Sequence, residues 1–469
     1  MRSVDEPFDL IVIGSGPAGQ RAAQQAATLD KRVALIERRQ SLGGVCVHSG
    51  TIPSKAIREA VLHLTGMAGG YLHDRPVQRR LSMSELLNVA ARVVHREVEV
   101  LSKRLATAGI CMFFGDASFV SPHVVHVQDT EGNASDIFGE RVLVAVGTTP
   151  ARPDDVPFDG RTVIDSNELL LLPELPESML ILGGGVIGTE YACMMAGAGV
   201  KVTLLERRDN LLGFVDEQIG RKLEAHLIGL GVDLRLGVKV GPIRTDGKSA
   251  TIIADGRATK ADVLLYTLGR QGAVSGLDLH KAGLAPDDRG RLVVDEAFRT
   301  SVPHIYAAGD VIGFPALAAT SVEQGRAAAC SMFGCWTDRD AVPHADSKPI
   351  FPFGVYTIPE ISMIGPTEQQ LVAAAQPFAV GCCNYSQTAR GHLLGDNDGF
   401  LKLLFHPQSR RLLAVHAIGT QACELVHLGQ AVMAANFPVD YFIDSIFNYP
   451  TLAETYKLAA EDGIRKLAA

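Results

Sequence analysis

The architecture of this chain follows from one segment, FDLIVIGSGPAG at residues 8–19. Its apolar half predicts a β-strand, and its glycines predict a tight turn that leads into a helix from Gln20 to about Leu29. A second apolar run at residues 32–36 closes on Glu37. This order predicts a βαβ unit that binds a dinucleotide. The glycines let the backbone approach a pyrophosphate, the helix N-terminus attracts its charge, and Glu37 accepts hydrogen bonds from a ribose.

The same pattern returns at residues 179–206. Four apolar residues, Met179–Leu182, run into GGGVIG at residues 183–188, and a predicted helix carries Glu190. The second strand closes on Glu206, which stands 18 residues after the last motif glycine, as Glu37 does in the first unit. Two such units in one chain predict two dinucleotide sites and a duplication at the level of the fold.

The regions outside these units predict the remaining organisation. Apolar strands at residues 142–150 and 264–270 each contain a glycine near their end, Gly147 and Gly269, and we expect them to carry the chain between domains. From about residue 345 short β-like runs precede a helix near residues 424–435. The fold class is therefore α/β, with two Rossmann-like domains and an α+β C-terminal domain.

Composition excludes several classes of protein. A net charge of −8 and a pI near 6.0 argue against a nucleic-acid partner, because phosphate attraction requires a basic surface. The eight cysteines show no paired ligand spacing, so we expect no metal site. We also expect no membrane span and a cytoplasmic location, because no apolar run is long enough and no leader precedes the first strand.

The segment GGVCVHSGTIPSK at residues 43–55 carries a family resemblance. It resembles the active-site segment of the flavin-dependent disulfide oxidoreductases, which read Gly-Gly-x-Cys-x-x-x-x-Cys-x-Pro-x-Lys. Cys46 occupies the first cysteine position, and Thr51 stands where the second would be. A disulfide requires two sulfurs about 2 Å apart, so this chain cannot form that pair.

The resemblance extends over nearly the whole chain and implies a glutathione-reductase-like fold. It implies an FAD-binding domain at residues 1–150 and 276–344, an NAD(P)-binding domain at 151–275 and a dimerisation domain at 345–469. The cofactors implied are FAD, with NAD(H) and NADP(H) as substrates. The implied cofactor-binding residues are Gly14, Ser15, Gly16, Pro17, Gly19, Glu37, Arg38, Gly43, Gly44, Cys46, Lys55, Gly147, Gly183, Gly185, Val186, Ile187, Gly188, Glu190, Glu206, Arg207, Arg208, Gly269, Arg270, Gly309 and Asp310.

A second departure from the family lies near the C-terminus. Disulfide reductases have His-Pro-Thr-x-x-Glu there, and this chain has Tyr449 in the place of the histidine while Glu454 is kept. A tyrosine with a pKa near 10 is a poor base at neutral pH, where an imidazole is a good one. The chain therefore departs at both the dithiol and its base, which indicates a substrate that needs neither. The alternative role for Tyr449 is packing.

Four residues are the catalytic candidates. The family implies an ion pair of Lys55 and Glu190 beside the flavin N5, and Thr51 and Tyr449 mark the two departures. The alternative for Lys55 and Glu190 is a pair of exposed charges. Cys46 is interpreted as lining the flavin pocket, with a peroxidatic thiol as the alternative.

Glu206, Arg207 and Arg208 bear on the choice of nicotinamide. An acid at this strand end suits the 2′-hydroxyl of NAD(H), and arginines suit the 2′-phosphate of NADP(H). We interpret the combination as tolerance of both nucleotides. The alternative is a preference for NAD(H) with solvated arginines.

Two segments narrow the resemblance. Residues 50–55, GTIPSK, and residues 447–451, FNYPT, are similar to those of the soluble pyridine nucleotide transhydrogenases. That group implies a ping-pong hydride transfer from NADPH to NAD⁺, without a redox-active disulfide, in a homodimer or larger homo-oligomer. The alternatives are an NAD(P)H diaphorase or oxidase, a flavoprotein like dihydrolipoamide dehydrogenase, and a redox-sensing flavoprotein without turnover.

Overall fold

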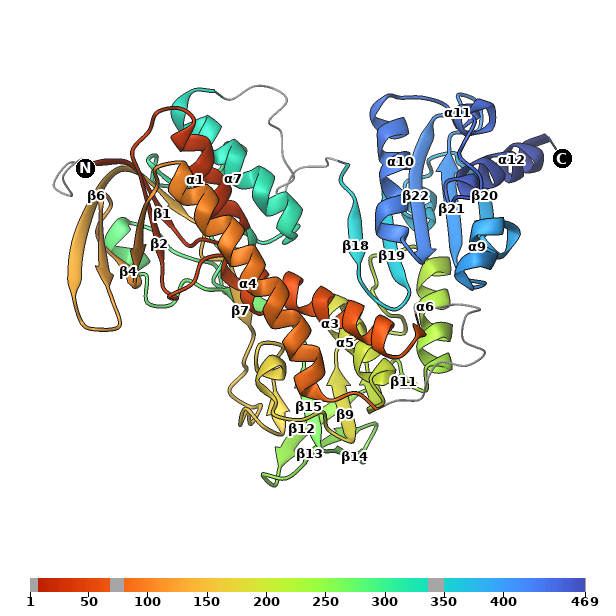
Figure 1. The fold of residues 1–469 in the computed structure, drawn as a ribbon, viewed down its shortest axis with the longest axis horizontal. Helices are drawn as coiled ribbons and strands as arrows, with labels where there is room; N and C mark the ends of the chain where they lie inside the picture. Colours follow the sequence, from red (N-terminus) through yellow and green to blue (C-terminus); the bar gives the residue numbers. More distant parts are fainter. Residues whose placement is uncertain (1–6, 68–79, 336–349, 469) are drawn as a thin grey trace. The chain divides into compact units, whose positions relative to one another are not determined.

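A computed structural model describes residues 7–67, 80–335 and 350–468 (Figure 1). The chain divides into two compact units. The first holds the described residues of Met1–Ala56, Asn88–Ala151 and Gly269–Pro349. The second holds those of Ile57–Leu87, Arg152–Leu268 and Ile350–Ala469. The domain limit predicted at residue 344 lies outside the described residues, and the other predicted limits remain predictions.

The first unit is built on a seven-stranded sheet in which β17 pairs with β6, beside the path β3-β2-β1-β6-β5-β4. The pairs β1–β2, β2–β3, β1–β6 and β6–β17 are parallel, whereas β4 and β5 extend the sheet as an antiparallel hairpin. The strands are β1 (Phe8–Ile13), β2 (Val33–Glu37), β3 (Cys111–Phe114), β4 (Asp116–Ser121), β5 (Val124–Gln128), β6 (Ala134–Val144) and β17 (Ile305–Ala307). A short antiparallel pair joins β7 (Thr148–Pro150) to β16 (Arg270–Gly272).

Two helices of the first unit pack closely although they are far apart in sequence. Helices α1 (Pro17–Ala27) and α7 (Ala318–Phe333) lie side by side in Figure 1. A Cβ atom placed on Gly325 of α7 would lie 2.0 Å from the carbonyl oxygen of Ala18, so the contact requires glycine. This packing holds the N-terminus of α1 against the segment that follows β17.

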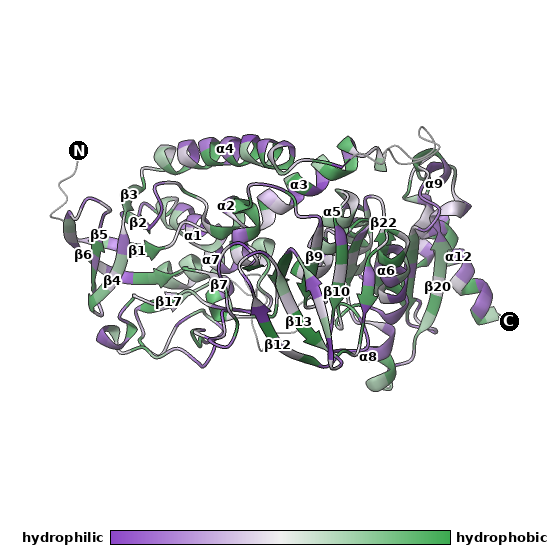
Figure 2. Ribbon diagram, turned by 90° about the horizontal axis from the view of Figure 1, so that it is seen from below, coloured by the Kyte–Doolittle hydropathy of each residue, from purple (hydrophilic) through white to green (hydrophobic). Residues whose placement is uncertain are grey.

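The predicted active-site segment at residues 43–55 does not form one continuous helix. Helix α2 (Gly44–His48) ends, and α3 (Thr51–Leu64) begins two residues after Ser49. Gly43 and Gly44 have φ values of 116° and 60°, which favour glycine and explain the turn into α2. Helices α3 and α4 (Met83–Thr107) each contain residues of both units, and the hydropathy colouring of Figure 2 shows α4 banded by its polar and apolar faces.

The second unit repeats the βαβ arrangement. Its five-stranded parallel sheet has the order β11-β10-β9-β15-β8, and a three-stranded antiparallel sheet has the order β12-β13-β14. Strand β9 enters helix α5 through the glycine loop. The elements are β8 (Val163–Ile164), β9 (Ser178–Leu182), α5 (Val186–Gly197), β10 (Lys201–Leu205), α6 (Glu217–Gly229), β11 (Asp233–Arg235), β12 (Val240–Thr245), β13 (Ala250–Ala254), β14 (Arg257–Ala261) and β15 (Val263–Tyr266).

The second unit also contains the C-terminal α+β region. A five-stranded antiparallel sheet, in the order β18-β19-β22-β21-β20, is covered by helices. Its elements are β18 (Phe353–Val355), β19 (Glu360–Ile364), α8 (Glu368–Ala373), β20 (Ala379–Asn384), α9 (Ala389–Leu394), β21 (Phe400–Phe405), β22 (Leu412–Gly419), α10 (Ala422–Ala434), α11 (Asp440–Asp444) and α12 (Glu454–Ala468).

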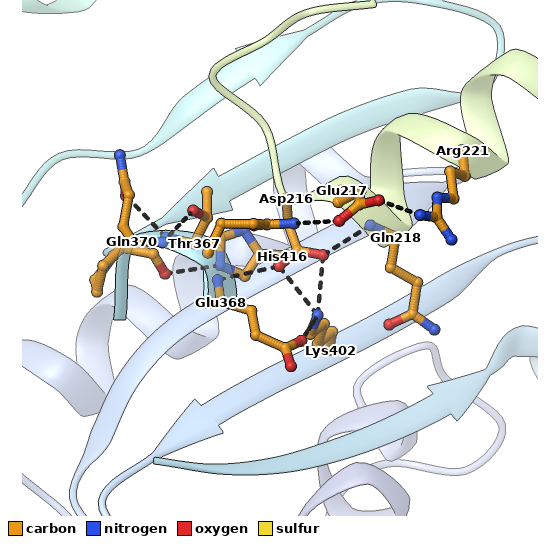
Figure 3. A network of polar contacts seen from close by, with 11 residues as sticks. Asp216, Glu217, Gln218, Arg221, Thr367, Glu368, Gln370, Lys402 and His416 are labelled. Atoms are coloured by element: carbon orange, nitrogen blue, oxygen red, sulfur yellow. Dashed lines mark hydrogen bonds and ion pairs between the residues drawn. The ribbon is translucent and has the colours of Figure 1, made fainter. Parts of the chain in front are cut away.

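A buried ionic network joins this sheet to helix α6 (Figure 3). The Lys402 ammonium of β21 contacts both oxygens of Asp216, at 2.9 and 3.0 Å, and the carboxylate of Glu368. Asp216 also caps α6 by accepting from the Gln218 N–H. Burial would lower the pKa of Lys402, but its hydrogen bonds to Glu368 and Asp216 outweigh that effect and raise it.

These observations confirm the predicted fold class, with two Rossmann-like arrangements and an α+β C-terminal region. The local differences are small. The first helix begins at Pro17 rather than Gln20, because proline suits a helix N-terminus, where its missing N–H costs no bond. The run at residues 142–150 is two strands, since the chain turns at Gly147 with φ 67°. Among the described residues, no helix is both long and apolar enough to cross a membrane.

Candidate dinucleotide sites

A cavity of the first unit brings together most of the predicted residues of the first motif. Its walls come from the glycine loop, the ends of β2 and β6, the start of α2 and the segment after β17. The predicted residues that line it are Gly14, Ser15, Gly16, Pro17, Glu37, Arg38, Gly44, Cys46, Thr51, Gly147, Gly309 and Asp310. The sites therefore gather at the carboxyl ends of parallel strands, as open α/β sheets require.

Glu37 and Ser15 tie three segments of this cavity together. The Glu37 carboxylate accepts from the Ser15 N–H at 3.1 Å, from the Ser15 hydroxyl at 2.6 Å and from the Arg39 N–H at 3.1 Å. The Ser15 hydroxyl in turn accepts from the Gly43 N–H at 2.8 Å. Glycine loop, second strand and active-site segment are thus held in one hydrogen-bonded cluster, and Ser15 is fully buried.

The cavity fits a dinucleotide where the family resemblance places FAD. A Cβ atom at Gly16 or Gly147 would meet no atom within 4 Å, so open space lies over both backbones. Gly16 is the N-cap of α1 and no side chain caps that end, which leaves backbone N–H groups to bind a phosphate. Glu37 stands at the end of β2, where a ribose is expected.

Asp310 lies at the other side of the same cavity. Burial raises its pKa, while Arg270 and the hydroxyls of Ser321 and Thr148 act against that shift. The hydroxyls donate to its two oxygens at 3.3 and 3.5 Å. The neighbouring Gly309 N–H donates to the buried Gln324 side chain at 2.9 Å, which fixes the turn that presents Asp310.

Cys46 and Thr51 both line the cavity. Burial raises the pKa of the Cys46 thiol, and a hydrogen bond with Thr51 opposes that shift without reversing it. The threonine hydroxyl therefore occupies the neighbourhood of the thiol that a second sulfur takes in a dithiol. A thiol with a raised pKa is a poor nucleophile, which weakens the alternative of a peroxidatic cysteine.

Other predicted residues of the first unit do not line the cavity but shape or connect the segments around it. A Cβ on Gly19 would lie 1.9 Å from the Gly14 carbonyl oxygen, so Gly19 permits the loop to close against α1. Arg270 donates from Nε and Nη2 to Thr148, at 2.8 Å each, and so links β16 to β7. Lys55 lies one turn into α3, and Gly269 has φ 95° at the return to the first unit.

The second unit repeats the cluster without the two hydrogen bonds that the Ser15 hydroxyl makes in the first. Glu206 accepts from the Gly184 N–H at 2.6 Å and from the Arg208 N–H at 2.9 Å. Gly184 has no side chain with which to add the hydroxyl bond that Ser15 makes. A Cβ on Gly188 would lie 1.9 Å from the Gly183 oxygen, which repeats the Gly19 contact, and Gly185 is exposed with no atom within 4 Å of its Cβ position.

The predicted specificity residues differ in exposure. Glu206 is buried, whereas Arg207 and Arg208 are exposed. Val186 and Ile187 are the first two residues of α5, so they lie beside the glycine loop as expected. An acid at this position suits a ribose hydroxyl, and an exposed guanidinium suits a phosphate.

The remaining catalytic candidates lie in the second unit. Glu190, in the first turn and a half of α5, is buried and accepts from the Tyr356 N–H at 2.9 Å. Tyr449 is 74% exposed, so it does not pack in the core. Oε2 of Glu454 is buried and has no hydrogen-bond partner among the described residues. The pairing of Lys55 with Glu190 remains a prediction, because the two residues belong to different units.

Several site residues carried no signal in the sequence. Ser321 and Gln324 support Asp310 and its turn from helix α7, outside every motif, and Thr148 supports it from the segment at residues 142–150, in which only Gly147 was predicted. Arg39 lines the cavity directly after the predicted Arg38, and residues 275–277 line it from a loop. Arg39 lies two residues after Glu37 and could have been predicted from that position, but the others depend on tertiary contacts.

Comparison with known proteins agrees with this geometry. Residues 8–325 match the family model for pyridine nucleotide-disulphide oxidoreductases, and residues 351–460 match the dimerisation domain of the same family. Soluble pyridine nucleotide transhydrogenases from Mycobacterium tuberculosis and Colwellia psychrerythraea are 45% and 37% identical, each over 98% of both chains.

Solved structures give the same fold. The HOCl-induced flavoprotein disulfide reductase RclA from Escherichia coli matches with a TM-score of 0.85 and 28% identity, over 97% of this chain and 99% of that one. LpdA from Mycobacterium tuberculosis matches with a TM-score of 0.86 and 24% identity, over 98% and 100% of the two chains.

Proposed function

The chain belongs to the pyridine nucleotide-disulphide oxidoreductase family, and from that premise we propose that it is an FAD-dependent transhydrogenase. The proposed reaction is NADPH + NAD⁺ → NADP⁺ + NADH. One hydride, with its two electrons, leaves NADPH and arrives at NAD⁺, and no proton or thiol is consumed. The nucleotides bind in turn at the second motif, so the order is ping-pong.

One observation carries this proposal: the cavity holds a single thiol. All eight cysteines are described and free, and among them Cys46 alone lines the cavity, beside Thr51. A disulfide reductase needs a second sulfur to pass electrons to a substrate disulfide. Without a second sulfur as electron acceptor, the nicotinamide nucleotides, which the family shares, remain as both hydride donor and hydride acceptor.

The residues of the first unit would hold the flavin nucleotide. The free N–H groups at the start of α1 would bind its pyrophosphate, Glu37 a ribose hydroxyl and Asp310 the ribityl chain. When bound, FAD supplies a ring that accepts a hydride and returns it. Lys55, one turn into α3, would provide a positive charge that favours the reduced, anionic form of that ring.

The residues of the second unit would bind the nicotinamide nucleotides. We propose that Glu206 accepts from the 2′-hydroxyl of NAD(H), while Arg207 and Arg208 bind the 2′-phosphate of NADP(H). The exposure of both arginines and the burial of Glu206 support two alternative contacts at one strand end. A transhydrogenase needs both, since each nucleotide must enter the same site.

Two further features of the chain support a homodimer and a cytoplasmic location. The match to the dimerisation domain and the exposed Tyr449 support a homodimer in which this segment meets a second copy. Eight free cysteines support a reducing compartment such as the cytoplasm.

An anaerobic steady-state assay tests the function. Purified protein with NADPH and thio-NAD⁺ should form reduced thio-NAD without added thiol, quinone or O₂. Dihydrolipoamide- or glutathione-linked turnover at a comparable rate would contradict the proposal and favour a disulfide reductase. Rapid NADPH oxidation that requires a quinone or O₂ would instead favour a diaphorase or oxidase.

A further inference from the structure

Arg58 is a buried arginine that neither cofactor motif explains. It lies in α3, three residues after Lys55, and is 4% exposed. Its Nε donates to the Thr357 carbonyl oxygen at 2.8 Å, and its Nη1 lies 3.3 Å from Glu360 Oε1. The same Nη1 donates to Glu59 at 2.6 Å, on the solvent side. All of these residues belong to the second unit.

Arg58 binds the loop at residues 356–360, which comprises the connection between β18 and β19 and the first residue of β19. It is anchored from a second side, because Glu360 Oε2 accepts from the Cys423 N–H of α10 at 3.1 Å. Thr357 is fully buried. Arg58 and Cys423 therefore hold the two oxygens of one carboxylate, and the loop has little freedom to move.

This loop contacts helix α5 at two points. The Tyr356 N–H donates to Glu190 Oε1 at 2.9 Å, and the backbone of Ile358 hydrogen-bonds the Cys193 thiol, three residues further along the helix. A continuous chain of bonds thus leads from the Arg58 guanidinium through the loop backbone to the Glu190 carboxylate. A shift of the loop would move the N–H on which that carboxylate rests.

Stability alone does not account for this arrangement. Burying a guanidinium and a carboxylate costs desolvation, and replacing such a pair by apolar residues is often neutral or stabilising. An apolar side chain would join α3 to the loop, but it would not fix the loop backbone by directed bonds to a carbonyl and a carboxylate.

We propose that Arg58 and Glu360 are positioning residues for hydride transfer, which set the place of the Glu190 carboxylate through the loop at residues 356–360. The inference rests on the proposed function, since it assigns Glu190 a part in that reaction. Hydride transfer is sensitive to small displacements, because the reacting atoms must lie within van der Waals distance and in line.

The test removes both charges together. Arg58→Met alone would leave the partly buried Glu360 without its cation, so the double variant Arg58→Met/Glu360→Gln keeps the fold testable. We expect it to retain FAD and to slow the limiting rate of flavin reduction by NADPH about tenfold, with the Kd for NADPH changed less than about twofold. Glu59→Gln, which removes the solvent-side partner of the same guanidinium, should keep the wild-type rate.

A double-mutant cycle that adds Glu190→Gln separates the positioning of the Glu190 carboxylate from a general structural effect. In the Glu190→Gln background the double variant should change the reduction rate by less than about twofold, because the loop then has no carboxylate to place. An unchanged rate in the double variant overturns the proposal, and so does a tenfold loss that persists in the Glu190→Gln background.

The readout also keeps this inference apart from the proposed function. Flavin reduction by NADPH is a half-reaction, and its rate is measured whichever acceptor follows. A wild-type protein that reduces its flavin but does not reduce thio-NAD⁺ would contradict the transhydrogenase proposal and leave the Arg58 comparison intact.

Discussion

The two candidate dinucleotide sites, the first cradle around Ser15 and Glu37 and the second cradle around Gly184 and Glu206, have the same hydrogen-bonded frame. They differ in how tightly they are closed. In each, an acid at the end of the second strand accepts from a glycine-loop N–H and from an N–H two residues further on. The first cradle has Ser15, whose hydroxyl donates to Glu37 and accepts from Gly43. The second has Gly184 in that position, and its loop is exposed at Gly185.

Under the proposed function, this difference separates a site for a resident cofactor from a site for an exchanging substrate. The serine joins the glycine loop to the active-site segment, so opening the first cradle would break a buried hydrogen-bonded cluster. In the second cradle no side chain makes this link, and one backbone hydrogen bond, from the Leu212 N–H to the Gly184 carbonyl oxygen at 2.9 Å, joins the loop to another segment at this position. We therefore expect FAD to stay bound through turnover, while the nicotinamides exchange.

The largest expected effect comes from a matched pair of glycines. A Cβ at Gly19 or at Gly188 would lie 1.9 Å from a loop carbonyl oxygen. Gly188→Ala should keep the FAD spectrum but lower the rate of flavin reduction by NADPH and NADH about 100-fold or more, because the loop can no longer close.

Gly19→Ala is the control, and it should yield protein depleted of FAD. Absorbance at the flavin band and stopped-flow reduction measure the two outcomes. Loss of FAD in Gly188→Ala would contradict the independence of the two cradles.

Arg208→Ala should weaken NADP(H) selectively. Charge-assisted hydrogen bonds contribute roughly 1.5–3 kcal/mol each, which corresponds to about 10- to 150-fold in affinity. We expect the Kd for NADPH to rise within that range and the Kd for NADH to change less than about twofold. The dependence of the flavin reduction rate on nucleotide concentration, followed by anaerobic stopped flow, gives both constants, and equal losses for the two nucleotides would remove the specificity argument.

Replacing each terminal acid by glutamine compares the two cradles directly. Glu206→Gln should raise the Kd for NADH about tenfold, because the amide cannot accept from both N–H groups and also from a ribose. Glu37→Gln should leave NADH binding unaffected and lower the fraction of protein that retains FAD. A nicotinamide defect in Glu37→Gln, in protein with full FAD, would mean that the acids are not local to their own cradles.

The smallest effect is expected at the lone thiol. Cys46→Ser should keep transhydrogenation within about twofold of wild type, because burial already raises the pKa of this thiol and keeps it protonated at neutral pH. The steady-state assay with thio-NAD⁺ measures it. A collapse of the rate would restore a covalent role for Cys46.

The sequence predicts the cradles better than it predicts their supports. Glycine spacing and the terminal acids Glu37 and Glu206 are local features, since the turn and the strand end are set by residues within one βαβ unit. Ser15 was predicted as a ligand, but its link to Gly43 depends on how a segment 28 residues away folds back.

The residues that hold the other candidate site residues in place are more distant still in the sequence. Arg58 meets Thr357 across 299 residues, and Thr148 meets Asp310 across 162. No periodicity or spacing in a single sequence encodes such pairs, because they are created by the packing of whole sheets and helices. The same holds for Lys402 and Asp216, which are 186 residues apart and join β21 to α6 (Figure 3).

A reductive titration tests the central claim most directly. The purified protein, kept anaerobic, is titrated with dithionite while the flavin absorbance is followed. A flavin with no disulfide beside it should be fully reduced by two electrons per FAD. Uptake of four electrons per FAD, with a charge-transfer band at the halfway point, would show a second redox couple and contradict the account.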